Sequence, residues 1–316
     1  MTANAIIEAA NLIKKRGSRT VLCIDALSIA GGSLVAVVGP NGSGKSTLAR
    51  ILAGVDPNFQ GSVRIGGRNP IEQRDRVAYL PQGTVTSPLL TGWETVQFYS
   101  RLGGMSFSAI RPRVQMLFER FGLAGDANRL VRTYSGGMRR KLDLIVTLLA
   151  DDKDIFVLDE PTTGVDPESR SKFLDILHRE YAGRTRVLIT HYPTEGELAD
   201  SVIFLANGRV VAWGTPTALK QQYVPGLVVE VRTPYPPADL RNYLSSFGLT
   251  YPFPDGFRVI PRGRMEATEI ARQVEETYSR HPLEVSVVKP TLDDIYAILA
   301  VTANPEDTEQ ATARSG

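Results

Sequence analysis

The residues with the clearest chemical meaning form one loop near the start of the chain. Residues 39–47 read Gly-Pro-Asn-Gly-Ser-Gly-Lys-Ser-Thr and fit the pattern G-x-x-x-x-G-K-[ST], which holds the phosphates of a nucleotide. Glycines let backbone N–H groups wrap a triphosphate, and Lys45 should reach its β- and γ-phosphates. The Ser46 hydroxyl is suited to bind Mg²⁺. The predicted site comprises Gly39, Pro40, Asn41, Gly42, Ser43, Gly44, Lys45, Ser46 and Thr47.

Two elements must position this loop, and the flanking sequence predicts both. Residues 34–38 form an unbroken apolar run, as in a strand buried on both faces. Residues 47–53 are typical of a helix that stops at Gly54. The N-terminus of such a helix favours anions through its unpaired N–H groups and its dipole. The alternative, a glycine-rich turn with a chance Lys-Ser pair, does not account for this context.

A pair of carboxylates supplies the next candidates. Residues 155–158 are apolar and predict a buried strand that ends in Asp159 and Glu160. If this strand is adjacent to the phosphate loop, Asp159 lies beside Mg²⁺ and binds it directly or through water. Glu160 can then point at the γ-phosphate and orient or deprotonate the attacking water. The alternative is a strand that ends in a solvated acidic loop.

Two further polar residues follow predicted strands. Gln82 comes after the strand at 76–80, and His191 comes directly after the strand at 186–190. In open α/β sheets, ligands bind at the carboxyl ends of the strands. We expect Gln82 to contact Mg²⁺ or the attacking water, and His191 to contact the γ-phosphate or Glu160. The predicted catalytic set is Glu160, His191, Lys45 and Gln82, and the predicted metal ligands are Ser46, Gln82 and Asp159.

A second place for an anion precedes the apolar helix predicted at 140–149. Ser135, Gly136 and Gly137 stand at its N-terminus, where a hydroxyl and free backbone N–H groups can meet phosphate oxygens. One phosphate loop and two phosphate-binding places in one chain suggest that the second place serves a nucleotide held by another chain. The alternative is that Ser135 is an ordinary N-cap.

The remaining pattern predicts two domains. Strands alternate with helices up to about residue 222, which is typical of a parallel α/β sheet, and the helices at 93–102 and 108–121 predict a helical subdomain at about 83–150. From residue 226 the order β-α-β-β-α-β favours a small ferredoxin-like module. The predicted boundaries are therefore 1–222 for the first domain, 222–225 for the linker, 226–300 for the accessory module and 301–316 for a disordered tail.

Composition excludes some classes of function. The 316 residues carry 36 Lys and Arg against 34 Asp and Glu, a net charge of +2 that does not favour nucleic-acid binding. The single cysteine, Cys23, allows no internal disulfide, which suits a reducing compartment. No window approaches the roughly 18 to 20 apolar residues that span a bilayer. Any action at a membrane would therefore need other chains to supply the spans.

Taken together, these motifs resemble the ATP-binding cassette (ABC) transporter ATPases over residues 1 to about 222. Residues 39–47 look like the Walker A loop, and residues 134–138 look like the signature loop. Asp159 and Glu160 look like the end of Walker B with its catalytic glutamate, while Gln82 and His191 resemble the Q-loop and switch residues. The resemblance implies a P-loop NTPase cassette with a RecA-like, mostly parallel core, an antiparallel β subdomain and a helical subdomain.

The resemblance also implies cofactors and partners. ATP and Mg²⁺ would lie between the Walker A loop of one copy and Ser135, Gly136 and Gly137 of the other in a head-to-tail homodimer. A separately encoded membrane permease would bind the helical subdomain, with the ATPase in the cytoplasm on the inner face of the cell membrane. The segments at 135–144 and 290–296 look like the drug-resistance and polysaccharide exporter branch. No nucleic-acid partner is expected, and the alternative is a non-transport ABC ATPase that acts on nucleic acid or the ribosome.

Two positions depart from the family pattern. The signature reads Tyr-Ser-Gly-Gly-Met at 134–138 where the family often has Leu-Ser-Gly-Gly-Gln, which leaves the Ser-Gly-Gly contact intact. Arg16 stands before Gly17, where an aromatic residue usually stacks on adenine. A guanidinium plane can also stack on a base, so Arg16 is assigned to the nucleotide site.

Overall fold

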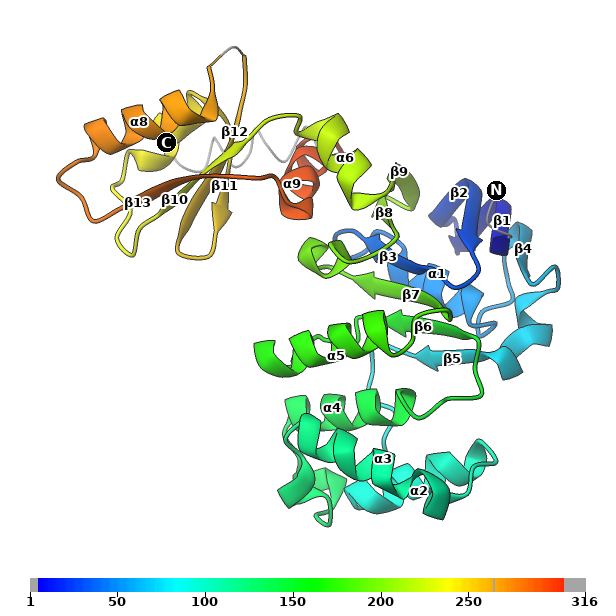
Figure 1. Ribbon diagram of the computed structural model, residues 1–316. Coiled ribbons are helices and arrows are strands. Elements are labelled where there is room, and N and C mark those ends of the chain that lie inside the picture. Colours follow the sequence, from blue (N-terminus) through cyan, green and yellow to red (C-terminus); the bar gives the residue numbers. More distant parts are fainter. Residues whose placement is uncertain (1–4, 264, 304–316) are drawn as a thin grey trace. The chain divides into compact units, whose positions relative to one another are not determined.

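The computed structural model describes residues 5–263 and 265–303. The chain divides into two compact units, Met1–Trp213 and Gly214–Gly316 (Figure 1). Among the described residues, none of the helices has the length and apolar character required to cross a bilayer. Each unit has its own apolar core, and the nucleotide-binding motifs all lie in the first.

A six-stranded sheet forms the centre of the first unit. Its strands are β3 (Leu34–Val38), β5 (Val77–Leu80), β6 (Ile155–Asp159), β7 (Thr185–Thr190), β8 (Ser201–Ala206) and β9 (Arg209–Gly214). The strand order is β5-β6-β7-β3-β8-β9, and the pairs from β5 through β8 are parallel. Every residue of β3, β6 and β7 is buried, which explains their unbroken apolar runs. The carboxyl ends of these strands therefore meet along one edge of the sheet.

A three-stranded antiparallel sheet covers the phosphate-loop helix. It consists of β1 (Ala5–Arg16), β2 (Arg19–Ala30) and β4 (Gln60–Ile65), in the order β2-β1-β4. Helix α1 (Lys45–Leu52) contacts β2 on one side and β6 and β7 on the other. Apolar side chains of all three layers form one core cluster. Helix α1 is thus fixed between the two sheets, and the loop that precedes it is held at the sheet edge.

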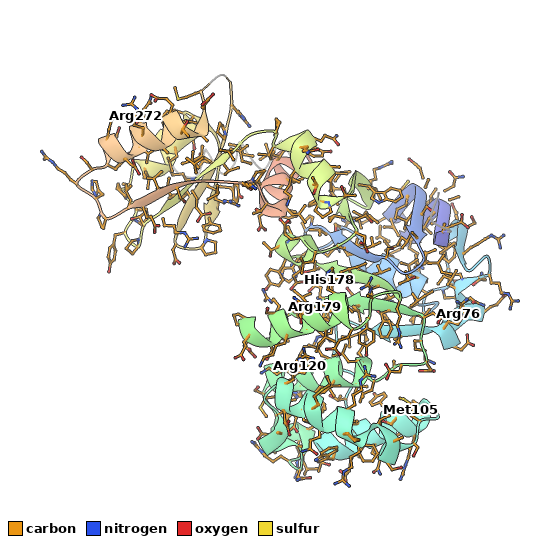
Figure 2. The ribbon with its side chains drawn as sticks, viewed as in Figure 1. Arg76, Met105, Arg120, His178, Arg179 and Arg272 are labelled. Atoms are coloured by element: carbon orange, nitrogen blue, oxygen red, sulfur yellow. The ribbon has the colours of Figure 1, made fainter. Side chains whose placement is uncertain are left out.

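Three helices form the helical subdomain between β5 and β6. They are α2 (Gly92–Leu102), α3 (Phe107–Arg120) and α4 (Gly136–Thr147), and α4 also packs on β5. Thr91 caps α2, and Glu94 completes a reciprocal capping box. Helix α5 (Pro167–Arg179) follows β6, and His178 near its end is exposed (Figure 2). Short 3-10 helices occupy Pro70–Arg76, Ala124–Asp126, Val131–Thr133 and Pro193–Gly196.

In its described residues, the second unit contains a four-stranded antiparallel sheet and four helices. Its elements are α6 (Pro216–Tyr223), β10 (Val228–Arg232), α7 (Leu240–Ser245), β11 (Gly248–Phe253), β12 (Gly256–Pro261), α8 (Ala267–Thr277), β13 (Glu284–Val288) and α9 (Leu292–Ala303). The strand order is β11-β12-β10-β13. Helices α7 and α8 share one apolar cluster with Val229, Val231 and Val259, so both pack on the same face of the sheet.

The opposite face of this sheet binds the start of α9. Glu230 and Arg258 alternate with the core valines and are buried, and the Arg258 guanidinium lies 3.1 Å from Asp294 and 3.3 Å from Glu230. The Tyr251 hydroxyl donates to Asp294 at 2.6 Å. Each of these buried charges has a partner, so none is left isolated in the core. The same contacts attach the start of α9 to the sheet.

The structure differs from the sequence-based expectation at several boundaries. The sequence predicts no helix at 216–223, yet α6 forms there, with Thr215 as its N-cap, and packs on α9. The division between the units accordingly falls before α6, whereas the sequence places the linker at 222–225. Residues 301–303 continue α9, and residues 304–316 of the predicted disordered tail lie outside the described residues.

Candidate nucleotide site

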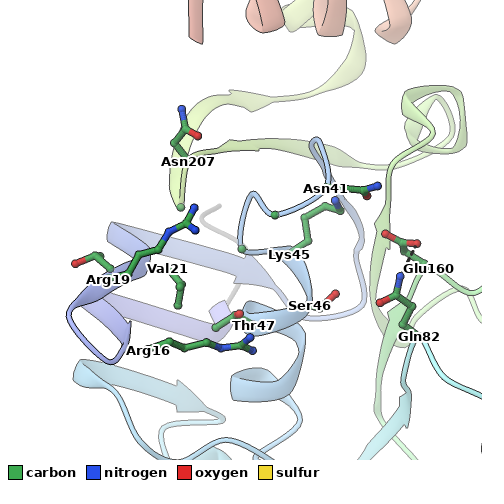
Figure 3. A pocket seen from close by; sticks show the side chains of 14 residues that line it. Arg16, Arg19, Val21, Asn41, Lys45, Ser46, Thr47, Gln82, Glu160 and Asn207 are labelled. Atoms are coloured by element: carbon green, nitrogen blue, oxygen red, sulfur yellow. Dashed lines mark hydrogen bonds between the residues drawn. The ribbon is translucent and has the colours of Figure 1, made fainter. Parts of the chain in front are cut away.

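A cleft of about 710 Å³ opens beside the phosphate loop (Figure 3). Of the residues predicted to be catalytic or to bind nucleotide or metal, those lining it are Arg16, Asn41, Gly42, Gly44, Lys45, Ser46, Thr47, Gln82 and Glu160. They come from the β1–β2 hairpin, the loop after β3, and the carboxyl ends of β5 and β6. Segments far apart in the sequence therefore converge on one cavity. Gly39, Pro40 and Ser43 belong to the same loop but are not among the lining residues.

The loop leaves backbone donors available to an anion. Gly44 is the N-cap of α1 with φ 103°, and no side chain caps the helix. A Cβ at Gly44 would lie 2.8 Å from the carbonyl oxygen of Val21, so the position is closed to larger residues. At Gly39 a Cβ would lie 2.1 Å from the carbonyl oxygen of Leu205. Gly39 is thus required because the loop packs against the end of β8. The reason expected from the sequence is different, namely the close approach of the backbone to phosphate.

Lys45 is held in the loop by backbone carbonyls, and it forms no ion pair with the described residues. It is 4% exposed, and its Nζ donates to the carbonyl oxygens of Gly39 at 2.7 Å and Pro40 at 2.9 Å. Burial lowers the pKa of the Lys45 ammonium, and the nearby carboxylates of Glu160 and Asp159 oppose that shift. A triphosphate placed against the loop would supply the negative charge that the buried ammonium lacks.

Asp159 at the end of β6 meets Ser46 at the start of α1. The end of β6 is adjacent to the phosphate loop, as supposed from the sequence, although β7 lies between β6 and β3 in the sheet. Helix α1 crosses over β7 to reach β6, and the Ser46 Oγ donates to Asp159 Oδ1 at 3.0 Å. Burial raises the pKa of Asp159, the Ser46 hydrogen bond opposes this effect, and Glu160 adds to it. The carboxylate and the hydroxyl are thus together, as a shared cation would require.

Glu160 is the centre of a polar cluster at the carboxyl end of β6. Its Oε2 accepts a hydrogen bond from Gln82 Nε2 at 3.1 Å (Figure 3). The same oxygen accepts from Thr163 Oγ1 at 3.3 Å and lies 3.4 Å from Nδ1 of His191. The backbone φ of Glu160 is 47°, and its N–H donates to the carbonyl of Ile189 at 2.8 Å. This turn leaves the sheet and directs the carboxylate to the cleft. His191 itself is not among the cleft-lining residues.

The Ser-Gly-Gly segment lies outside the cleft of its own chain. Ser135 is exposed and accepts a hydrogen bond from Met138 N at 3.2 Å, so it is the N-cap of α4. Helix α4 begins at Gly136, before the predicted start at 140. A Cβ at Gly137 would lie 2.9 Å from the carbonyl oxygen of Gly164. The segment is therefore accessible from solvent, and it does not line the cleft beside its own phosphate loop.

Sequence reasoning missed part of the outer cleft. The additional lining residues are Arg19, Thr20, Val21, Asn207 and Gly208. The sequence indicates a hairpin turn at Asn207 and Gly208, and both have positive φ, but that signal says nothing about a ligand. The β8–β9 turn approaches the β1–β2 hairpin because Cys23 N donates to the carbonyl of Gly208 at 2.7 Å. Only this tertiary contact brings the turn to the cleft.

Comparison with known proteins identifies the family. A family model described as ABC transporter matches residues 25–163. The chain is 34% identical to the daunorubicin/doxorubicin resistance ATP-binding protein DrrA of Streptomyces peucetius, over 96% of each chain. The chain belongs to the ABC transporter ATP-binding proteins. This ABC subunit is also 36% identical to a Nod factor export ATP-binding protein I of Burkholderia orbicola, over 77% of this chain and 81% of the relative.

Solved structures show the same cassette fold. The ATP-binding cassette MJ0796, solved as a dimer in a post-hydrolysis state with ADP and phosphate, matches with a TM-score of 0.60 and 26% identity. The match covers 66% of this chain and 98% of that one. An ATP-binding subunit of an ABC transporter matches with a TM-score of 0.61 and 27% identity, over 69% of this chain and 93% of that one. The ABC subunit described here is therefore an ATPase that couples ATP hydrolysis to transport.

Proposed function

We propose that this subunit hydrolyses ATP between two copies of itself and powers a separately encoded permease that exports a drug, a lipid or an oligosaccharide. Relatives named for daunorubicin and doxorubicin resistance and for Nod factor export support the exporter assignment. The observation that carries the proposal is the meeting of Ser46 and Asp159 at 3.0 Å beside the cleft that contains Lys45. A phosphate loop with no cation site would not support hydrolysis.

The residues present fit a magnesium ion. Ser46 Oγ, Asp159 Oδ1 and the Gln82 amide oxygen are oxygen donors of the kind that Mg²⁺ prefers, and Asp159 is buried with its pKa raised. Mg²⁺ would neutralise charge on the β- and γ-phosphate oxygens when bound. Ser46 and Asp159 would hold the ion, with Gln82 as a further ligand or as a ligand to its water.

Each remaining residue has a task that its position supports. Lys45 would place its ammonium against the β- and γ-phosphates and stabilise negative charge there. Glu160 would accept a proton from the attacking water or hold it in line. His191, at 3.4 Å from the carboxylate, would orient Glu160 or reach the γ-phosphate. Arg16 lines the outer cleft, where the residues that line the cavity include no aromatic side chain, and its guanidinium would stack on the base.

The homodimer is proposed from the exposed Ser-Gly-Gly segment. Ser135, Gly136 and Gly137 begin α4, whose N-terminal N–H groups favour anions, yet they lie outside the cleft of their own chain. In a head-to-tail pair they would face the nucleotide held by the other copy's phosphate loop. A permease bound to the helical subdomain would hold the pair on the inner face of the cell membrane.

We further propose that residues 226–300 form a ferredoxin-like accessory module that follows, along the chain, a cassette at 1–222. The observed order β10-α7-β11-β12-α8-β13 and the strand order β11-β12-β10-β13 support it. Its role would be to stabilise the cassette or the dimer.

The decisive test is reconstitution with the permease. The full chain would be mixed with membranes of its source, the membranes would be solubilised in detergent, and the chain would be captured together with the proteins bound to it. We expect a polytopic membrane protein to co-purify, and phosphate release from ATP to require Mg²⁺ and to stop with a chelator. Capture of RNA or ribosomes without a membrane protein would instead support the nucleic-acid alternative and overturn the proposal.

A further inference from the structure

Arg140 connects the helix after the Ser-Gly-Gly segment to the hydrolytic residues. It lies on α4, one turn from Gly136, and is 4% exposed. Its guanidinium donates hydrogen bonds of 2.8 to 3.0 Å to the backbone carbonyls of Pro81, Asp159, Glu160 and Pro161. One side chain therefore fixes both the segment that leads into Gln82 and the turn that presents Glu160.

Asp143, one turn further along α4, binds the other end of the same segment. It is fully buried, and its Oδ1 accepts the backbone N–H groups of Val85 at 3.3 Å and Thr86 at 3.2 Å. The Asp143 carboxylate also lies 3.9 Å from the Arg140 guanidinium. The loop from Pro81 to Thr86 is thus attached to α4 at both ends, once through a carbonyl and once through two amides.

We propose that Arg140 and Asp143 are positioning residues for hydrolysis, and this inference rests on the proposed role of Glu160. The pair would set the distance between Gln82 and Glu160, whose side chains meet at 3.1 Å on the face of the cleft. The Glu160 backbone has φ 47°, a conformation that non-glycine residues adopt only when the surroundings impose it. Arg140 supplies that constraint by binding the carbonyls on both sides of the Glu160 N–H.

The chemistry of arginine explains why this residue type is needed. The planar guanidinium has five N–H donors in a fixed arrangement, enough for four carbonyls that come from two separate segments. A lysine ammonium has three donors and cannot reach all four. Because α4 begins at the proposed contact with the partner's nucleotide, one turn of helix and the Arg140 hydrogen bonds connect that contact to Glu160.

A matched set of variants tests the inference. Arg140→Gln removes the four hydrogen bonds, Arg140→Lys keeps the charge, and Asp143→Asn keeps an acceptor for Val85 while removing the ion pair. Arg186→Gln is the control, because Arg186 is 3% exposed and also binds backbone carbonyls, those of Leu177, His178 and Gly32, but does not line the cleft. Each full-length variant is assayed for steady-state phosphate release, equilibrium ATP binding and unfolding temperature.

We expect Arg140→Gln to lower kcat about 10²-fold, because small displacements of catalytic groups have costs of that size, while the Kd for ATP changes less than about threefold. Arg140→Lys should recover part of kcat, and Arg186→Gln should lose stability with little change in kcat. In a Gln82→Ala background the further loss from Arg140→Gln should be much smaller, since residues that act as a unit are not additive.

The inference fails if Arg140→Gln and Arg186→Gln lower kcat equally when they lower the unfolding temperature equally. It also fails if the fold-loss in kcat of the Gln82→Ala, Arg140→Gln double variant equals the product of the losses in the two single variants. Should Arg140→Gln not fold, Arg140→Lys and Asp143→Asn decide, and wild-type kcat in both would overturn the inference. Absence of hydrolysis in the wild-type chain with its permease would instead refute the proposed function.

Discussion

Replacing Glu160 by glutamine separates the chemistry at this site from its architecture. In the structure a single carboxylate oxygen accepts from Gln82 at 3.1 Å and from Thr163 at 3.3 Å. The glutamine amide keeps one oxygen in the same place, so these hydrogen bonds can persist and the cost in unfolding free energy should stay near 1 kcal/mol. What the amide cannot do is take a proton from water.

The expected kinetic effect is much larger than the effect on stability. Loss of a positioned general base costs about 10²- to 10⁴-fold in rate, which corresponds to about 3 to 5 kcal/mol of barrier. We expect Glu160→Gln to bind ATP with a Kd close to that of the wild type, because Lys45 and the loop amides are untouched. The variant should also remain a dimer with ATP bound, because ATP hydrolysis no longer separates the two copies.

The assay is phosphate release at saturating ATP and Mg²⁺, with Kd from equilibrium binding and dimer content from light scattering. Glu195→Gln is the matched control: Glu195 is 6% exposed, accepts from Thr162 Oγ1 at 2.5 Å and does not line the cleft. It should keep its kcat within about threefold. Undiminished hydrolysis in Glu160→Gln, or an equal loss in Glu195→Gln, would refute the assignment of Glu160 as the base.

Three further predictions concern the metal site, the pH dependence of stability and the contact with the adenine base of ATP. Ser46→Ala should lower hydrolysis at least about 10-fold and raise the Mg²⁺ concentration needed, as measured in a Mg²⁺ titration. A hydrogen bond from Lys141 holds the pKa of Asp166 below its ordinary value of 3.8. This interaction therefore stabilises the fold above pH 3.8, and the stabilisation is lost as the pH falls through the lowered pKa. The wild type should therefore unfold at a higher temperature than Asp166→Asn at neutral pH, with the difference vanishing in acid. Arg16→Ala should raise the Kd for ATP about two- to fivefold by removing a cation–π contact with the base, as measured by equilibrium binding.

Each of these has an outcome that contradicts it. An unchanged Mg²⁺ requirement in Ser46→Ala would remove that hydroxyl from the metal site. Asp166→Asn retains an N-cap for α5, so a difference in unfolding temperature that stays constant at all pH values would show that the ion pair with Lys141 is not its cause. Equal affinity of Arg16→Ala for ATP would exclude stacking on the base.

The sequence by itself specified the local elements of the phosphate site. The apolar run of β3 had to be a strand buried on both faces, and Gly44 with Lys45 and Ser46 had to turn into a helix N-terminus, because few other conformations satisfy those residue types. Such motifs are contiguous, so their geometry is set by residues that are neighbours in the chain.

The tertiary structure decided which distant segments meet. Asp159 reaches Ser46 because α1 crosses β7, a strand that no local pattern assigns to the place between β3 and β6. The four carbonyls around Arg140 come from two segments about 80 residues apart in the chain, and nothing in the sequence near 140 marks that arginine as buried. Burial and strand order depend on how the layers pack. The sequence therefore identifies the catalytic residues, whereas the contacts that bring them together and hold them in place emerge only from the folded chain.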